Sequence, residues 1–496
     1  MKNWHKFFNK SFFILGFILL IAIFLRLYRI DVLMRFIWDE GRDMLAVRNI
    51  IINHDLTLFG PFNEVAGHKD FFGVFHYYLI LPSLWLANFN PVGPAIFTAL
   101  LGVIAIGLTY YWLRKWLNEK TALAICALLA VSPLVVRFNQ WAWNPNSVGF
   151  FSIIYLIALQ QFQKQKYKLR KYFWIGVAGL FLGLLFQLHY FTIALIAPAF
   201  LILLQRYKKN WLEVFIFFSA FILPNLTFLI FDLTHAGFYR KIVLESFIGD
   251  SNQKFFIFSL KNLIIGPLQH LFDVSSKFLG SKILGLGLTI AWIVYSWKIL
   301  KEEKINYQND KKINEKSQLI LAWLLFLLFT SFFPSLLNDY HSAVLWPSLA
   351  IALVFTLQKI FKKYWPIVIT FLLIWLIYSN HFWRQPDWQE NMPQLRAVGL
   401  AIASDAKKQT TTNINIASLV DPETRGIRFR YFIIHAGQNL LGFDDYPRSE
   451  ILYAITPHSW QETTKNPAWE LETFREASAT AIWNNEEWTV FRVSKI

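Results

Sequence analysis

Cysteine is almost absent from this sequence, in which Cys126 is the single example among 496 residues. One cysteine cannot form an intrachain disulfide and cannot build a cysteine metal site. Charged residues are scarce as well, since Asp, Glu, Lys and Arg together make up only 16% of the chain. These two shortages exclude a disulfide framework and argue against a soluble globular protein.

Long apolar runs are what the sequence has in abundance. Hydrophobic residues make up 55% of the chain and aromatic residues 18%, with a mean hydropathy of +0.38. Runs of roughly 18 or more apolar residues, each long enough to cross a hydrocarbon core as a helix, recur to about residue 379. The sequence therefore predicts a polytopic α-helical membrane protein with about 11 to 13 transmembrane helices.

The formal net charge of +16 would suggest nucleic acid as a partner in a soluble protein. Here the Lys and Arg residues concentrate in short connectors between apolar runs, which indicates membrane topology and not a nucleic-acid partner. By the positive-inside rule, the basic connectors are expected in the cytoplasm and the other connectors outside, including the loop at residues 31–70 and everything after residue 380. The basic connectors are residues 114–120, 164–171, 206–209, 301–316 and 359–363.

The N-terminus carries Lys2, Lys6 and Lys10 before the apolar run of residues 11–25. A cleaved signal peptide is one interpretation, but residues 26–29 read Arg-Leu-Tyr-Arg where small residues would mark a cleavage site. An uncleaved first helix with a cytoplasmic N-terminus, in a multi-pass protein of the plasma membrane, is the better interpretation.

Two apolar segments, residues 71–89 and 92–113, separate the external loop from the basic connector at residue 114. Two full crossings here would invert every later assignment, so an odd number is expected. The first segment has Pro82 in its middle and could be re-entrant or lie in the outer leaflet, which gives eleven crossings. Twelve or thirteen stay open, because hydropathy does not separate a re-entrant helix from a short span.

Residues 381–496 have shorter apolar runs and an alternating pattern that predicts a small extracytoplasmic α/β domain, distinct from a transmembrane module at residues 1–380. This segment has no glycine-rich phosphate loop, metal-ligand spacing or nucleophile signature, so it is expected to bind or cover something and not to catalyse. Its expected order is a helix at 393–408, a strand at 415–420, a helix at 425–441, a strand at 450–455 and a hairpin at 479–493.

The stretch Trp38-Asp39-Glu40-Gly41-Arg42-Asp43 follows the first apolar run almost at once. Ionisable groups at a membrane surface are costly without a cavity or partner, so they are functional-site candidates. The apolar residues from Met44 to Ile51 recur with helical spacing and predict an amphipathic surface helix with Asp39 near its start. Alternatively, Asp39 is only the N-cap, and Glu40 and Asp43 stabilise the first turn.

The other outward connectors contribute further polar residues on the same predicted face. Their simpler interpretations are a snorkelling arginine at 137, a helix-starting turn at 144–146, an interhelical hydrogen bond from the histidine at 189, and lipid-phosphate contacts at 240–241. As substrate-binding candidates the set is Arg42, Asp43, His68, Lys69, Asp70, Arg137, Asn144, Asn146, His189, Tyr190, Arg240, Lys241, Tyr340 and His341.

A carboxylate at a membrane surface can act as a general base toward an acceptor, and nearby cations can stabilise a phosphate leaving group. A lipid-linked phosphosugar presents such a phosphate at headgroup depth. Inversion requires the base and the leaving group on opposite faces of the sugar, with Asp39 as the base here. A divalent cation could also bind, because carboxylates and asparagines supply hard oxygen ligands, although no spacing demands one.

Four motifs occur in the order typical of a known family: Trp38-Asp39-Glu40, His68-Lys69-Asp70 followed by His76-Tyr77-Tyr78, Ser132-Pro133 with Arg137, and Asp339-Tyr340-His341 before Pro347. Over residues 10–380 the chain resembles the GT-C membrane glycosyltransferases. Within them it is similar to the dolichyl-phosphate-mannose protein mannosyltransferases (glycosyltransferase family 39) and the related aminoarabinose transferases. The prolines usual after the second motif are missing, and asparagines at 144 and 146 stand where relatives often have an aspartate.

The resemblance implies that Asp39 is the catalytic base, with Glu40 as its neighbour, and that the Tyr340 motif lies near the lipid phosphate. It also implies a polyprenyl-phosphate sugar donor, membrane lipid around the protein, and a protein, lipid or glycan acceptor that offers a hydroxyl or amine. Two other functions stay open: a transporter or flippase of a lipid-linked glycan, for which no internal repeat is evident, and a non-catalytic assembly protein.

Overall fold

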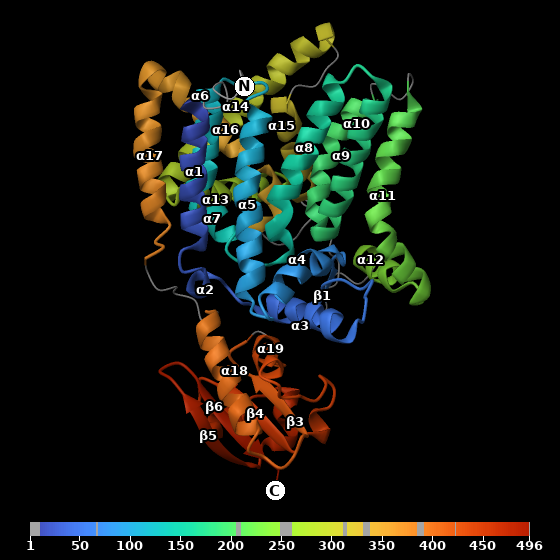
Figure 1. Cartoon of the computed structure of the whole chain (residues 1–496), viewed down its shortest axis with the longest axis vertical. Coiled ribbons are helices and arrows are strands. Elements are labelled where there is room, and N and C mark those ends of the chain that lie inside the picture. Colours follow the sequence, from blue (N-terminus) through green and yellow to red (C-terminus); the bar gives the residue numbers. More distant parts are fainter. Residues whose placement is uncertain are drawn as a thin grey trace, which may run out of the picture. The chain divides into compact units, whose positions relative to one another are not determined.

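The computed structural model describes residues 10–65, 68–204, 210–248, 260–310, 315–330, 338–383, 391–421 and 423–495. The chain forms two compact units, each assembled from segments that are distant in sequence (Figure 1). The transmembrane unit comprises Met1–Tyr28, Leu56–Leu79 and Ala95–Arg384, and the α/β unit comprises Arg29–Asp55, Ile80–Pro94 and Gln385–Ile496.

Long apolar helices make up most of the transmembrane unit, as in a multi-pass membrane protein. In the part of the chain that the structure describes, six segments are long and apolar enough to cross a bilayer. The expected count of about 11 to 13 crossings stays a prediction, because it also depends on shorter apolar helices. The six segments are α1 (Lys10–Leu27), α5 (Val92–Leu113), α9 (Lys168–Leu188), α11 (Trp211–Thr234), Lys282–Glu302 of α14 (Lys282–Asp310), and Pro347–Ser379, which joins α16 (Pro347–Phe361) to α17 (Trp365–Ser379).

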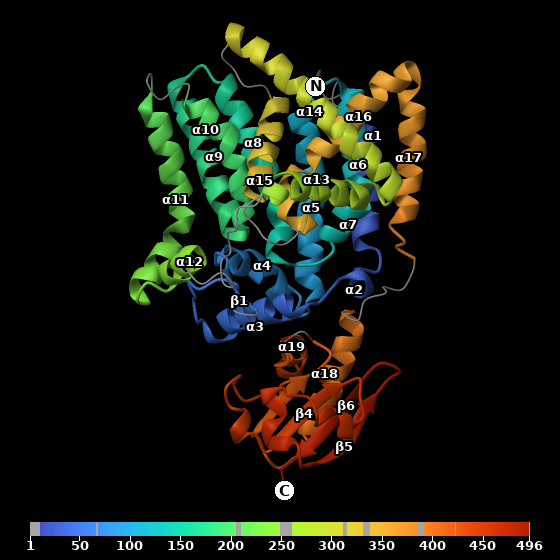
Figure 2. The same cartoon turned by 180° about the vertical axis from the view of Figure 1, so that it is seen from behind.

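Shorter helices complete this unit. One of them, α13, lies across the long helices (Figure 2). They are α6 (Glu119–Val131), α7 (Pro133–Phe138), η2 (Asn144–Ser147), α8 (Val148–Lys164), η3 (Tyr190–Leu195), α10 (Ile196–Leu204), α12 (Phe238–Ile248), α13 (Leu260–Leu279), α15 (Glu315–Thr330), η4 (Asp339–Leu345) and η5 (Lys362–Tyr364), with a two-stranded hairpin of β1 (Phe62–Val65) and β2 (His68–Phe71).

Close helix packing explains two glycines of α9, which packs against both α8 and α11. A Cβ added at Gly179 would lie 2.2 Å from the carbonyl oxygen of Phe217, and one at Gly183 would lie 2.4 Å from that of Phe221. Small residues four apart let two helix backbones approach inside a membrane, where van der Waals packing replaces the hydrophobic effect as the driving force.

The helix α4 (Phe75–Leu86) corresponds to the apolar segment that resisted assignment as a crossing. Its 12 residues span only about 18 Å at 1.5 Å per residue, which is short of a hydrocarbon core of about 30 Å. Asn88 and Phe89 follow with positive φ, and α5 begins at Val92. The length of α4 agrees with the expectation that this segment does not complete a crossing.

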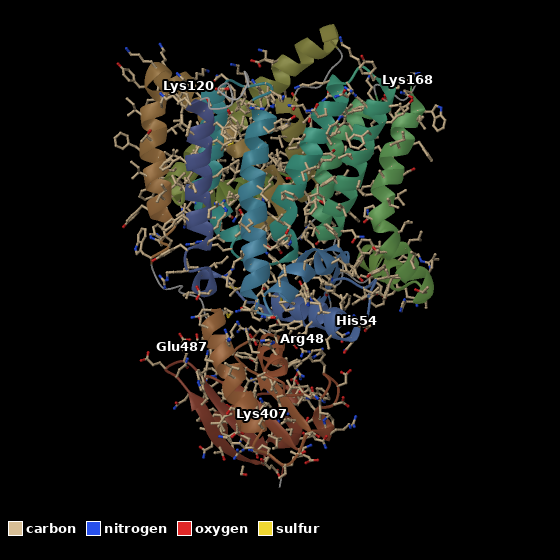
Figure 3. The ribbon with its side chains drawn as sticks, viewed as in Figure 1. Arg48, His54, Lys120, Lys168, Lys407 and Glu487 are labelled. Carbon is tan, nitrogen blue, oxygen red and sulfur yellow. The ribbon has the colours of Figure 1, made fainter. Side chains whose placement is uncertain are left out.

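The basic connectors of the transmembrane unit can be followed in Figure 3, where Lys120 and Lys168 lie at the same end of the helices. This arrangement agrees with the assignment of both connectors to one side of the membrane. Which side that is stays a prediction, and the connector at residues 206–209 lies outside the described residues.

The α/β unit contains the helix expected after the acidic stretch, whose place on the membrane surface stays a prediction, and the expected C-terminal elements. A four-stranded sheet has the order β3-β4-β6-β5, with β3 parallel to β4 and the other pairs antiparallel. The second expected helix is shorter than residues 425–441, because it ends at His435 just before Gly437 with φ of 83°. The elements are α2 (Ile30–Leu33), α3 (Trp38–Asn53), α18 (Met392–Ala406), β3 (Ile414–Ser418), α19 (Ile427–His435), η6 (Tyr446–Arg448), β4 (Ile451–Thr456), α20 (Trp460–Thr463), η7 (Trp469–Phe474), β5 (Ser478–Asn484) and β6 (Thr489–Ser494).

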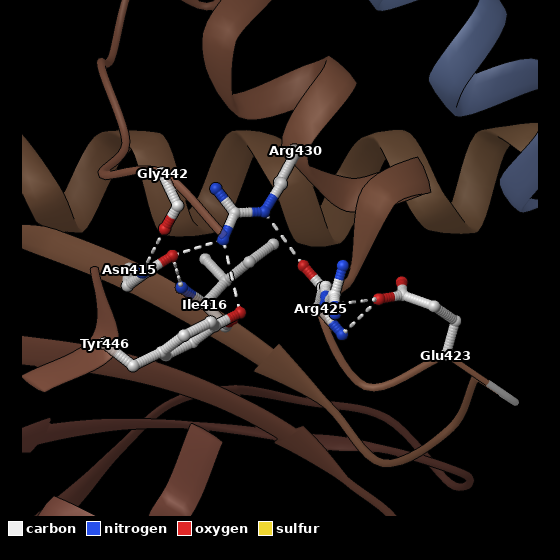
Figure 4. A network of polar contacts seen from close by, with 7 residues as sticks. All are labelled: Asn415, Ile416, Glu423, Arg425, Arg430, Gly442 and Tyr446. Carbon is white, nitrogen blue, oxygen red and sulfur yellow. Dashed lines mark hydrogen bonds and ion pairs between the residues drawn. The ribbon is translucent and has the colours of Figure 1, made fainter. Parts of the chain in front are cut away.

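The buried side chain of Arg430 connects α19 to the sheet through hydrogen bonds (Figure 4). The Arg430 guanidinium donates hydrogen bonds to the carbonyl oxygens of Arg425 and Leu441, both at 2.9 Å. It also donates to the side-chain oxygen of Asn415 on β3 and, at 3.3 Å, to the hydroxyl of Tyr446. Because one planar group contacts four separate backbone or side-chain oxygens, the position of α19 relative to β3 is closely defined.

Another buried arginine, Arg26 of α1, joins three elements of the transmembrane unit. Its Nε donates to the Asn139 side chain at 3.1 Å, and its Nη1 and Nη2 donate to the carbonyl oxygens of Ala130 and Leu129 at 2.8 and 3.3 Å. Those carbonyls belong to the last turn of α6, where helix carbonyls have no partner within the helix and favour a cation. Arg26 therefore fixes the break between α6 and α7.

We predict that Asn139→Ala lowers the free energy of unfolding by about 1.5 to 3 kcal/mol, the usual loss when a hydrogen bond to a buried charged group is removed. Thermal unfolding of the full-length protein in detergent measures the change. The exposed Lys168→Ala is the control and should unfold as the wild type does. An unchanged unfolding temperature for Asn139→Ala would show that Arg26 does not depend on this partner.

Candidate active site

The acidic stretch forms the first turn of α3, and its local fold follows from the sequence. Ile37 has extended backbone angles and occupies the N-cap position, and the Glu40 Oε2 accepts a hydrogen bond from the Ile37 backbone N–H at 3.0 Å. This carboxylate replaces one of the partners that the first helical N–H groups lack. The alternative in which Asp39 is the N-cap is wrong, because Asp39 is the second residue inside the helix.

The Arg42 guanidinium forms ion pairs with two carboxylates in this turn. The Arg42 Nη1 lies 2.8 Å from the Asp39 Oδ1, and its Nε and Nη2 lie 2.8 and 2.7 Å from the Asp43 Oδ1. The Arg42 side chain is 17% exposed and that of Asp43 is fully buried. Two anions and one cation leave the turn with a net negative charge before Glu40 is considered, and this charge is held largely away from water.

Glu40 differs from its neighbours because the guanidinium does not reach it. Its side chain is completely buried, and its Oε1 has no hydrogen-bond partner among the residues described. Burial first, and then the negative charges of Asp39 and Asp43, raise the pKa of Glu40 well above its ordinary value of 4.5. The turn therefore combines an Asp39 paired with a guanidinium and a Glu40 that keeps its proton to a higher pH than an ordinary glutamate. Acid–base sites often place two carboxyl groups in such different environments.

A cluster of histidine and aromatic rings gathers in the transmembrane unit, from loops at the ends of several helices. The His189 ring lies 5.1 Å from Phe72, 5.7 Å from Tyr340 and 5.3 Å from His341, centroid to centroid. Tyr190 stacks on Phe72 at 5.7 Å. Four of the predicted site residues are thus brought together from two distant parts of the sequence.

The asparagines predicted for this site hold its loops in place. The Asn144 side chain donates to the carbonyl oxygen of Leu188 at 2.7 Å, and the Asn146 side chain donates to that of Trp141 at 2.9 Å. Residues 144–147 form the short helix η2, as the helix-starting interpretation expected. The His189 Nδ1 accepts a hydrogen bond from the Phe191 backbone at 3.3 Å, which caps the next turn.

Sequence reasoning missed the charged pair beside this cluster. The Lys277 Nζ lies 2.8 Å from the Asp339 Oδ2, next to Tyr340, and the Lys277 side chain is 57% exposed. Trp143, whose ring packs against Tyr340 at 4.5 Å, was also missed. The sequence offered one signal for Lys277, a positive charge at the end of an outward segment. No local pattern indicated that it pairs with Asp339, which lies 62 residues further along the chain.

The remaining predicted residues belong to other elements. Arg240 donates to Asp232 through its backbone and its side chain, so its exposed guanidinium is already paired. Arg137 is exposed on α7 and Lys241 on α12. His68, Lys69 and Asp70 pair in β2 with Val65, Glu64 and Asn63 of β1, and their side chains lie outside the described part.

The predicted residues are thus divided between the two units, with 39–43 in the α/β unit and the histidine–aromatic cluster in the transmembrane unit. Among the side chains described, no three His, Cys, Asp or Glu residues gather in an arrangement that could hold a metal ion. A divalent cation stays a prediction.

Residues 73–231 match the family of dolichyl-phosphate-mannose-protein mannosyltransferases. These residues are therefore similar to that mannosyltransferase family, and the match covers less than half of the chain. The match begins after the acidic turn and contains Asn144, Asn146 and His189, whereas Tyr340 and His341 lie beyond it. No curated protein matches the sequence significantly.

Solved structures extend the similarity over the whole fold. ArnT from Cupriavidus metallidurans bound to undecaprenyl phosphate has 10% identity and a TM-score of 0.59, and the alignment covers 97% of each chain. The apo state of the same protein gives 12% identity, a TM-score of 0.51 and the same coverage. The oligosaccharyltransferase of Archaeoglobus fulgidus in complex with zinc and sulfate has 13% identity and a TM-score of 0.52, over 89% of this chain and 67% of that one. Together with the family match, this GT-C fold indicates an enzyme of the glycosyltransferase class.

The raised pKa of Glu40 predicts a pH dependence of stability. Between pH 4.5 and the raised pKa, the folded state holds a proton that the unfolded chain has lost, so the free energy of unfolding falls as pH rises through this window. Glu40→Gln keeps an oxygen that accepts the hydrogen bond from the Ile37 N–H but cannot ionise. It should therefore remove this part of the fall in the free energy of unfolding. Unfolding temperatures at about pH 5 and about pH 8 measure it. An equal loss in wild type and variant would contradict a protonated Glu40.

Proposed function

We propose that this enzyme transfers a sugar from a polyprenyl-phosphate donor, with inversion, to an acceptor hydroxyl or amine at the outer face of the membrane. The observation that carries the proposal is the acidic first turn of α3, in which a guanidinium-paired Asp39 stands beside a buried Glu40. The family match to mannosyltransferases and the fold shared with ArnT, which binds undecaprenyl phosphate, support the same donor class.

Asp39 acts as the general base in this proposal. Its carboxylate removes the proton from the acceptor as the acceptor oxygen or nitrogen attacks the anomeric carbon, and the bond from that carbon to the phosphate oxygen breaks. The polyprenyl phosphate leaves with the bonding electron pair. Arg42 orients the Asp39 carboxylate through its 2.8 Å contact, and it also compensates the charge of Asp43, so that two anions can coexist in the turn.

Glu40 has a different role, because its buried position favours the protonated form. A protonated Glu40 adds no third negative charge beside Asp39. We therefore assign proton abstraction to Asp39 alone and treat Glu40 as its neutral neighbour.

The histidine–aromatic cluster of the transmembrane unit supplies the donor subsite in this proposal. Ring faces such as those of Tyr190 and Tyr340 can pack against a sugar or an isoprenoid, and Lys277, a half-exposed cation paired with Asp339, can exchange that partner for the phosphate. His341 stands beside Tyr340 with a centroid distance of 4.2 Å, and its buried Nδ1 has no hydrogen-bond partner among the residues described.

The proposed topology places the N-terminus in the cytoplasm and the acidic turn outside. Its support is the charge distribution, in which the basic connectors at Lys120 and Lys168 share one end of the transmembrane unit (Figure 3). We further propose that residues 1–380 form the transmembrane catalytic module, that residues 381–496 form an extracytoplasmic domain, and that a protein, lipid or glycan serves as acceptor.

We predict that Asp39→Asn reduces transfer by about 100-fold or more, as the loss of a general base typically does. Glu40→Gln is its matched control: an adjacent carboxyl in the same turn becomes an amide, and it should retain most of the activity because Glu40 is neutral in the active form. Transfer of label from a panel of radiolabelled polyprenyl-phosphate sugars, in membranes containing each variant, measures both.

Two outcomes would contradict the proposal. Normal turnover by Asp39→Asn would remove the assigned base. Movement of the labelled lipid between leaflets, with no new glycosidic bond from any donor, would instead identify a transporter.

A further inference from the structure

The helix α19 of the C-terminal segment packs against the acidic turn of α3 at a distance that only glycine permits. A Cβ added at Gly41 would lie 2.8 Å from the Arg428 Cα, 3.0 Å from its nitrogen and 3.1 Å from the carbonyl carbon of Ile427. All three atoms are backbone, so a side-chain rotation could not relieve the contact. Gly41 lies directly between Glu40 and Arg42, and this contact therefore acts on the acidic turn itself.

Aromatic residues extend the same interface on both sides of Gly41. Phe36, just before α3, packs with ring centroids 5.8 Å from Tyr431 and 5.1 Å from Phe432. The Tyr431 hydroxyl donates a hydrogen bond to the carbonyl oxygen of Phe89. The Arg48 guanidinium of α3 lies 5.8 Å from the centroid of that same Phe89 ring. Tyr431 and Phe432 of α19 thus contact Phe36 and Phe89, and Phe89 in turn lies against Arg48.

Further contacts hold α19 against α18 and β3. A Cβ added at Gly399 of α18 would lie 2.5 Å from the Phe432 Cβ. The Arg430 guanidinium donates hydrogen bonds to Asn415 on β3, Arg425 and Tyr446 (Figure 4), and also to the carbonyl oxygen of Leu441. Since α19 cannot approach α18 or move along β3 without breaking these contacts, it gives α3 a rigid support.

We infer that α19 positions the acidic turn of α3, with Gly41 and Tyr431 as positioning residues. The C-terminal domain then contributes to sugar transfer by holding Asp39 in place. The inference rests on the proposed function and deepens it. A base must be held close to its productive geometry, and a displacement of about 1 Å can reduce turnover by about 100-fold. The C-terminal domain therefore does more than cover or bind, which is all that its sequence predicted.

The test compares Gly41→Ala with Gly149→Ala in the full-length protein. Gly149 lies in α8, and a Cβ there would meet no atom within 4 Å. Alanine favours helix in both places, so the two variants differ in the contact that the new methyl group makes. We expect Gly41→Ala to lower kcat by about 10- to 100-fold with the donor KM within about twofold of wild type, and Gly149→Ala to leave both unchanged.

Tyr431→Phe is the second variant and keeps the ring contacts with Phe36 while it removes the hydrogen bond to Phe89. It should lower kcat by about 3- to 10-fold, again with an unchanged donor KM. If Gly41→Ala fails to fold, judged by size-exclusion elution and thermal unfolding, this variant decides the question. Wild-type kcat would then overturn the inference, and reduced kcat with unchanged KM would support it.

The results also separate this inference from the proposed function. Wild-type kcat in Gly41→Ala, with Asp39→Asn inactive, would refute positioning by α19 and leave the base assignment intact. An equal fall of kcat in Gly149→Ala, or a donor KM that rises in parallel, would show a general disturbance and also refute it. Full activity of Asp39→Asn would refute the proposed function, and the inference with it.

Discussion

Two carboxylates and one guanidinium are held together in the first turn of α3, largely away from water. Separately, each buried charge would cost several kcal/mol of desolvation. Arg42 reduces this cost for Asp39 and Asp43 at once, because its planar group presents several donors in one fork. Glu40 receives no such partner and becomes neutral more readily. The different chemistry of the two adjacent carboxyls thus follows first from the complete burial of Glu40, and then from the guanidinium that pairs with Asp39.

Local patterns predicted the elements of the α/β unit well. The apolar spacing from Met44 to Ile51 indicated α3, and turn residues around short apolar runs indicated both helices and the hairpin of the C-terminal segment. The pairing of α3 with α19 could not be predicted, since it joins Gly41 to Arg428 across most of the chain and leaves no periodic signal. In the sequence, Gly41 is only a residue of low helix propensity. The structure explains why glycine stands there, because the backbone of Arg428 leaves no room for a side chain.

The candidate residues of the transmembrane unit show a similar division. Sequence order indicated that His189, Tyr190, Tyr340 and His341 are all on outward connectors, and the structure brings their rings together. The asparagines at 144 and 146 were predicted to bind substrate, which stays a prediction, and their amide groups donate to the carbonyl oxygens of Leu188 and Trp141. Local sequence cannot separate an amide that binds a ligand from one that satisfies a buried carbonyl, because both depend on a partner distant in the chain.

The discontinuous make-up of the α/β unit affects how the enzyme is made. Residues 29–55 and 80–94 leave the ribosome early, whereas α19 and the sheet that supports it are among the last segments synthesised. At ordinary translation rates of about 5 to 20 residues per second, α3 waits tens of seconds for its partner. During that time its acidic turn lacks the surface against which it packs. An unfinished or truncated chain therefore exposes an acidic turn that still lacks the helix against which it packs.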